Sequence, residues 1–213
     1  MKLRHKLLTS ALIALAAPAA FAQSFAELKA TGLLVPGSCT LALTNGGIVA
    51  LGAINEIDLD PQAETALPAG SVSVDINCTA PTKVAAMITE NRGGSSTRTG
   101  DASFGLGKTS TGVSIGFYEA VAKTPMADGA PSTFITAPNT VGNLWASPTG
   151  DAFLEHGTGR KFVAFGTAAA GPSSVTTASL DIEVRPTIAP TTVLMLPAPE
   201  TIDGSLTMDL VYL

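Results

Sequence analysis

Apolar and polar residues alternate along much of the chain. The clearest case is residues 71–78, where valine, isoleucine and cysteine take every second position and polar residues take the others. A period of two is typical of a β-strand that buries one face and exposes the other. The pattern therefore predicts a half-buried strand over residues 71–78.

Other segments repeat this period and are bounded by glycine, proline or asparagine, which favour turns. Residues 40–51 predict a strand or hairpin interrupted at Asn45-Gly46-Gly47, and residues 180–184 predict a strand ended by Pro186. The longest alternation, with an apolar residue or glycine at every second position, covers residues 202–212. The remaining strands are expected at residues 83–90, 111–118 and 161–166.

This succession of short strands predicts an all-β fold, specifically an antiparallel β-sandwich of immunoglobulin-like type. The composition agrees, because 21 glycines and 14 prolines suit turn-rich structure and a hydrophobic content of 46% supports a packed core. No interdomain linker is visible, so residues 39–213 are expected to form one domain. An irregular insertion is expected over residues 138–159, around Trp145, which we expect to pack in the core.

The N-terminus has the features of a secretory signal peptide. Lys2, Arg4 and Lys6 precede an apolar run over residues 7–17, and Ala20-Phe21-Ala22 provides the small residues of a cleavage site. The apolar run is too short to span a bilayer, which takes about 20 residues. We therefore expect residues 1–22 to be removed and the mature protein to be exported and soluble.

Export determines whether the two cysteines can form a disulfide. An oxidising compartment allows Cys39 and Cys78 to pair, whereas a thiol-buffered cytosol would keep them reduced. We expect one disulfide; the alternative is two buried free thiols. Two cysteines with a single mature histidine do not make an ordinary zinc site.

The charge pattern and the rare catalytic residue types argue against nucleic-acid binding and catalysis. The net charge of −5 is spread as single acidic residues and includes no basic patch for nucleic acid. His156 stands in a loop-like stretch without a nucleophile motif, so we expect an exposed loop residue there. The chain is expected to be neither an enzyme nor the carrier of a cofactor or a metal.

Three features in one order resemble the pilin subunits of bacterial chaperone-usher fimbriae, a group of fimbrial-type adhesion proteins. The segment of residues 26–39 alternates and places Gly32 seven positions before the first cysteine. The pair Cys39 and Cys78 matches the pilin disulfide, which joins the first two strands. Residues 202–212 resemble the pilin C-terminal strand with its penultimate tyrosine, here Tyr212.

The resemblance implies an incomplete sandwich of pilin type that lacks its final strand. Residues 23–38 would be an N-terminal extension that donates the missing strand to a neighbouring subunit. The donor residues would be Leu28, Ala30, Gly32 and Leu34. The groove edge, which also contacts the chaperone, would be formed by Ile202, Leu206, Met208, Leu210 and Tyr212.

The resemblance also implies partners and a location. A periplasmic fimbrial chaperone, an outer-membrane usher and neighbouring pilin subunits would bind the chain on its way through the periplasm to a surface fimbria that serves cell adhesion. Two alternatives stay open. Residues 25–34 could be a disordered terminus or an ordinary first strand, and the protein could be an exported soluble or lectin-like binding protein, for example for surface glycans, with a self-complete sandwich.

Overall fold

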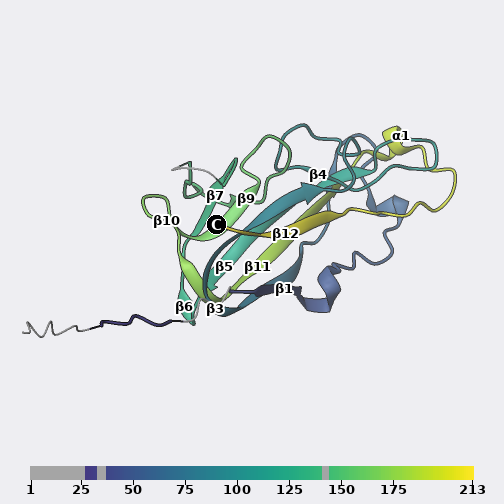
Figure 1. Ribbon diagram of the computed structural model, residues 1–213. Helices are drawn as coiled ribbons and strands as arrows, with labels where there is room; N and C mark the ends of the chain where they lie inside the picture. Colours follow the sequence, from purple (N-terminus) through teal and green to yellow (C-terminus); the bar gives the residue numbers. More distant parts are fainter. Residues whose placement is uncertain (1–26, 33–36, 141–143) are drawn as a thin grey trace, which may run out of the picture. The chain divides into compact units, whose positions relative to one another are not determined.

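The computed structural model describes residues 27–32, 37–140 and 144–213 (Figure 1). The chain divides into two units, Met1–Val35 and Pro36–Leu213. In the first unit, residues 27–32 are exposed and belong to no helix or strand. The expected signal peptide, residues 1–22, and the expected donor residue Leu34 lie outside the described residues.

The second unit is built from antiparallel strands, as the alternation predicts. Its described residues form one sheet of twelve strands that curls as a half-barrel, with almost no helix. The strands are β1 (Cys39–Leu43), β2 (Thr65–Ala66), β3 (Gly70–Glu90), β4 (Phe104–Gly105), β5 (Gly116–Ala127), β6 (Ala130–Pro131), β7 (Phe134–Ala137), β8 (Ala152–Phe153), β9 (Phe162–Thr167), β10 (Gly171–Pro172), β11 (Ser174–Ile188) and β12 (Leu206–Tyr212). The helix α1 (Thr191–Leu194) and the 3₁₀ turns Thr44–Gly47 and Glu56–Asp58 complete the unit. The all-β class is therefore confirmed.

The strand β3 corrects the prediction of two separate strands at residues 71–78 and 83–90. It is continuous, and its two halves pair with different neighbours: β1 along the first half and β12 along the second. Pro81 falls where the register with β11 shifts, between the pairs Asn77↔Thr177 and Thr82↔Val175. Because proline has no backbone N–H, a position without a β11 partner tolerates it.

Four other strands differ from the sequence prediction at their ends. Pro186 does not end β11, which continues to Ile188, and β5 starts at Gly116 and runs well past residue 118. β9 lies at Phe162–Thr167. The predicted hairpin over residues 40–51 is only β1 and a turn, since Asn45 and Gly46 adopt left-handed backbone angles with φ 52 and 62. Residues 48–55 belong to no strand.

The core lies on the concave side of the curled sheet. Alternate residues of β3 enter it from both halves, among them Val74 and Ile88, which are each 1% exposed. Trp145 is buried in a smaller cluster with Ile135, so the expectation of core packing is confirmed. Around Trp145, residues 123–159 contain the end of β5 and the short strands β6, β7 and β8.

The disulfide between Cys39 and Cys78 is confirmed. The two residues face each other in the antiparallel register of β1 and β3, so the bond fixes the first residue of β1 to the middle of the longest strand. Among the described residues, no helix has the length and apolar character needed to cross a membrane.

Candidate functional site: an open apolar groove

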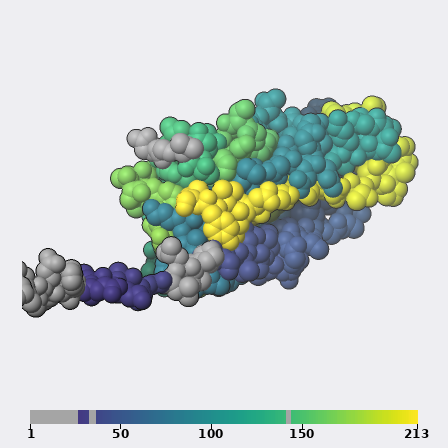
Figure 2. Space-filling view, in the orientation of Figure 1, coloured from purple at the N-terminus to yellow at the C-terminus, as the bar shows by residue number. Residues whose placement is uncertain are grey.

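The described residues of the second unit enclose an open, mainly apolar groove of about 1090 Å³. We call residues 47–56 its first wall and residues 196–206 its second wall. Figure 2 shows the C-terminal segment in yellow as a surface band, with the blue residues that include β1 and the first wall beside it. The floor consists of buried or half-buried side chains from the body of the sheet: Val72, Leu106, Ile115, Tyr118, Ile182, Val184 and Ile188.

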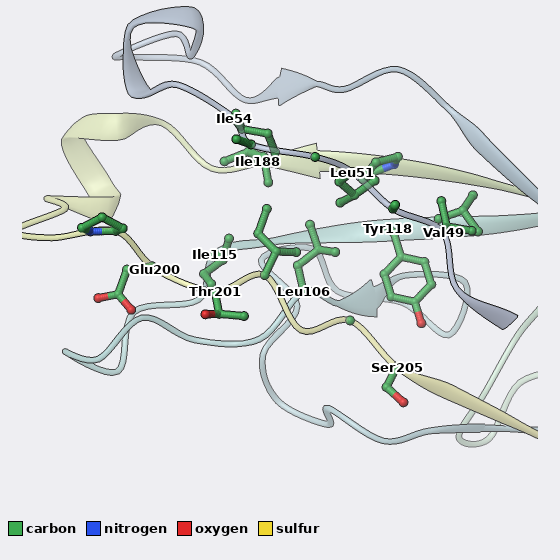
Figure 3. A pocket seen from close by; sticks show the side chains of 18 of the residues that line it. Val49, Leu51, Ile54, Leu106, Ile115, Tyr118, Ile188, Glu200, Thr201 and Ser205 are labelled. Carbon is green, nitrogen blue, oxygen red and sulfur yellow. The ribbon is translucent and has the colours of Figure 1, made fainter. Parts of the chain in front are cut away.

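The first wall has apolar side chains but no strand partner. Val49, Leu51 and Ile54 are half-buried and lie along the groove with the floor residues (Figure 3). Within the described part of the chain, the backbone groups of residues 49–54 make no hydrogen bond. Backbone groups beside an apolar surface form stable structure when they are paired. This wall can therefore accept hydrogen bonds from, and donate them to, an added strand.

The second wall continues into β12, whose outer edge is also free. The bonds Asn91 N to Ser205 O and Leu213 N to Lys83 O show that odd-numbered residues of this segment face β3. In an antiparallel ladder the alternate residues point their backbone groups to the other side. Leu206, Met208 and Leu210 therefore present N–H and C=O groups along an unpaired edge, since β12 pairs only with β3 among the described strands.

The outer edge of β1 shows the matching arrangement. Thr79 N donates to Ser38 O, which places the even-numbered residues of β1 against β3. Cys39, Leu41 and Leu43 therefore turn their backbone groups away from β3. Because β1 and β12 pair with the same edge of β3, at residues 74–78 and 84–90, their free edges flank the same opening.

Hydrogen bonds connect the chain segments beyond each end of the groove. At one end the backbone N–H of Cys39 donates to the Tyr212 hydroxyl over 2.8 Å. At the other end Thr191 N donates to Asp60 O over 3.2 Å, which ties the start of α1 to the chain after the first wall. These two bonds fix the positions of the segments that flank the groove.

Tyr118 is the polar residue of the floor. Its ring stacks on Phe104 with a centroid distance of 5.2 Å. Burial raises the pKa of the phenol, and the nearby Glu90 carboxylate raises it further. The hydroxyl therefore stays neutral under all physiological conditions, so the floor adds no charge of its own to the groove.

His156 lies behind this floor and corrects the expectation of an exposed loop residue. Its side chain is 16% exposed, its Nε2 is 3.6 Å from a Glu90 carboxylate oxygen, and its ring packs 4.9 Å from that of Phe104. The same ring nitrogen lies 3.3 Å from the Ser103 carbonyl oxygen. His156 has a structural position, and no nucleophile is paired with it in the described part of the chain.

Polar contacts hold the second wall in place. Arg92 forms an ion pair of 2.5 Å with Asp203, and Glu200 accepts hydrogen bonds from the backbone and the hydroxyl of Ser110. Gly204, directly after Asp203, packs closely against the floor: a Cβ there would lie 2.9 Å from the Tyr118 ring and 3.1 Å from Leu106. A side chain at Gly204 would displace the floor.

The residues expected from the sequence at the groove edge are distributed along its second wall and β12. Ile202 and Leu206 line the groove directly. Met208 and Leu210 are half-buried against the core next to it, and Tyr212 accepts a hydrogen bond from Cys39 beyond its end. The expected donor residues Leu28, Ala30 and Gly32 are exposed, and the side chain of Leu28 is 98% exposed.

The sequence missed the first wall and most of the floor. The segment of residues 48–55 contains apolar residues at 49, 51 and 54, but Gly52, with φ 70, interrupts the period of two. The floor residues Ile115, Tyr118 and Ile188 carry no local signal that separates them from the rest of the core. In the described residues no cluster of acidic, histidine or cysteine side chains is arranged to hold a metal ion.

Part of the chain matches a known protein-family model. A family model with the description "Protein of unknown function (DUF1120)" matches residues 28–103. The matched range starts inside the expected extension and contains both cysteines, β1, the first wall and β3. No curated protein matches the chain.

Proposed function

We propose that this chain is a structural subunit of a surface fimbria, assembled by donor-strand complementation and serving cell adhesion. The observation that carries the proposal is the apolar groove with unpaired backbone on both sides, at residues 49–54 and along β12. A free edge beside an exposed core is an unstable arrangement, and a strand from another molecule removes it. According to this proposal, the domain is an immunoglobulin-like sandwich that lacks its last strand.

The proposed occupant is the extension of a second copy. Residues 26–34 span about 30 Å when extended, and the ten-residue first wall spans at most about 33 Å. With Leu28, Ala30, Gly32 and Leu34 on one face, the segment offers two leucines to the floor. Their burial contributes about 3 to 6 kcal/mol, and each new strand hydrogen bond adds about 0.5 to 1.5 kcal/mol net.

The direction of the donor follows from where each chain leaves its own body. The extension of a subunit joins β1 at Cys39, which is hydrogen-bonded to Tyr212 at one end of that subunit's groove. A head-to-tail fibre needs incoming and outgoing neighbours at opposite ends. The donor therefore enters with Leu28 towards Tyr212 and leaves at the α1 end, so that it runs antiparallel to β12.

Before assembly the same groove needs a temporary partner. A periplasmic chaperone that lends a strand along β12 keeps the groove covered, and an outer-membrane usher then exchanges that strand for the extension of the next subunit. This sequence of partners places the mature protein first in the periplasm and then on the cell surface. The disulfide suits that route, because it forms in an oxidising compartment.

Coexpression of the exported chain with and without a fimbrial chaperone tests the proposal. We expect the chain to accumulate only with the chaperone, and chaperone-released subunits to form ladders that resist unheated detergent. A matched variant lacking residues 23–38 should keep the chaperone complex and form no ladder. A stable monomer without a chaperone, or a purified chain whose groove holds a lipid or another small apolar ligand, would contradict the proposal.

A further inference from the structure

The end of the groove at α1 exposes large apolar side chains. Ile57 is 91% exposed, Val193 is 49% exposed and Met195 is 71% exposed. We call these three residues the tip. Exposed apolar side chains are ordinary when they are scattered, but they indicate an interaction surface when they gather at one place.

Backbone hydrogen bonds and a buried side chain hold the tip in a fixed position. Thr191 N and Thr192 N donate to Asp60 O and Pro61 O, which joins the segment of Val193 and Met195 to the segment of Ile57. Leu194, between Val193 and Met195, is 1% exposed and anchors α1 in the core. Figure 1 shows α1 at one end of the second unit, away from the C-terminus.

We propose that the tip is a second contact between subunits, where the body of the copy that donates its strand rests on Ile57, Val193 and Met195. This inference rests on the proposed donor-strand assembly. In that assembly the donor leaves the groove at the α1 end. Only residues 35–38 then connect Leu34 to Cys39 of the donor's body, so these two residues lie at most about 18 Å apart. The donor's body must therefore lie against the tip.

The tip contact strengthens the joint, by which we mean the complex between two subunits, and leaves the groove unchanged. A synthetic peptide of residues 23–38 fills the groove but brings no body, whereas a whole subunit fills the groove and also covers the tip. We expect the joint between two subunits to dissociate at least tenfold more slowly than the complex of one subunit with the peptide. This factor corresponds to about 1.4 kcal/mol, less than the burial of one large apolar side chain contributes.

The test compares both lifetimes in the mature full-length chain and in its triple variant Ile57→Ser, Val193→Ser, Met195→Ser. The variant should bind the peptide as the parent chain does, and its subunit joints should lose the tenfold advantage. The matched control is Leu144→Ser, which changes an apolar side chain of 47% exposure outside the tip and should change neither lifetime.

A second variant protects the test against a folding defect. Met195 has φ 44, a left-handed value that glycine adopts without strain, so Met195→Gly removes the side chain and keeps the backbone. Its joints should dissociate faster with unchanged peptide binding. Equal joint lifetimes in the parent and the triple variant would refute the tip contact alone. If the peptide fails to bind the parent chain, the proposed function itself is wrong.

Discussion

Gly32 is the residue of the extension whose proposed role depends most on size. It has no Cβ, which allows close approach of the donor backbone where the groove is shallow. Nothing lies within 4 Å of a Cβ built at Gly32 in the free chain, so a larger residue there does not disturb the fold before assembly. The effect of a larger residue at position 32 should therefore appear only when subunits assemble.

We predict that Gly32→Leu lowers the yield of detergent-resistant ladders at least tenfold and leaves the chaperone complex intact. The matched control is Thr31→Leu, which adds the same side chain one position earlier, on the face that points away from the groove. The control should assemble as the parent chain does. Equal losses in both variants would show that the extension does not bind as an alternating strand.

Asp181 links three strands through short hydrogen bonds. Its carboxylate accepts from the Ser73 hydroxyl and from the Thr124 hydroxyl, each over 2.6 Å, and so connects β11 to β3 and β5. The Ser73 hydroxyl, followed by that of Thr124, holds the pKa of Asp181 below its ordinary value. The charged form of this carboxylate is therefore favoured in the folded state.

This lowered pKa predicts a pH dependence of stability. The stabilisation by Asp181 is present above the pKa of an unfolded aspartate, about 4, and is lost as the pH falls through the lower pKa of the folded state. Asp181→Asn should lower the melting temperature at pH 7 and have little effect at pH 2. The measurement is thermal unfolding across this range. A variant whose deficit persists undiminished at pH 2 would contradict the account.

At the scale of elements, the strand β1 bears the load of the proposed fibre. The extension joins the body at the start of β1, and the disulfide attaches that point directly to β3. A pull on the extension would otherwise act on one short strand at the sheet edge. In the proposed fibre, the disulfide would therefore strengthen the attachment of the extension to the body.

We predict that the double variant Cys39→Ser, Cys78→Ser loses stability. The disulfide closes a loop with a sequence separation of 39, and loops of that size are worth about 3 to 4 kcal/mol in the chain-entropy model. Urea unfolding of the chaperone-released, peptide-filled subunit measures this difference. A variant that unfolds at the same urea concentration as the parent would contradict a structural role for the disulfide.

The elements also show which parts of the fold the sequence can predict. Alternation located β3, β11 and β12 because each buries one face along many residues. It missed the continuity of β3, because Pro81 is a turn signal from sequence alone and is tolerated only where the register with β11 shifts. The first wall was missed because its residues are not part of a strand. The backbone groups of residues 49–54 make no hydrogen bond in the described chain, so the apolar residues there do not follow the period of two that marks a strand.

At the scale of the whole molecule, the groove lies between the segment that follows β1 and the segment that leads into β12. β12 ends beside the first residue of β1, and between the two strands no described segment of the chain completes the sheet. The sequence could predict an open edge from the resemblance of its two ends to pilins. The groove's depth depends on residues from β5, β11 and the second wall, which only the folded chain brings together.

Amide hydrogen exchange along β12 tests the central claim most directly, in the chaperone-released variant that lacks residues 23–38, with and without a peptide of those residues. Thr207, Asp209 and Val211 face β3 and should be protected in both states. Leu206, Met208 and Leu210 face the free edge, so their amides should exchange rapidly in the lone chain and become protected when the peptide binds. If these three amides are already protected in the lone chain, or stay unprotected with saturating peptide, the groove does not accept a strand.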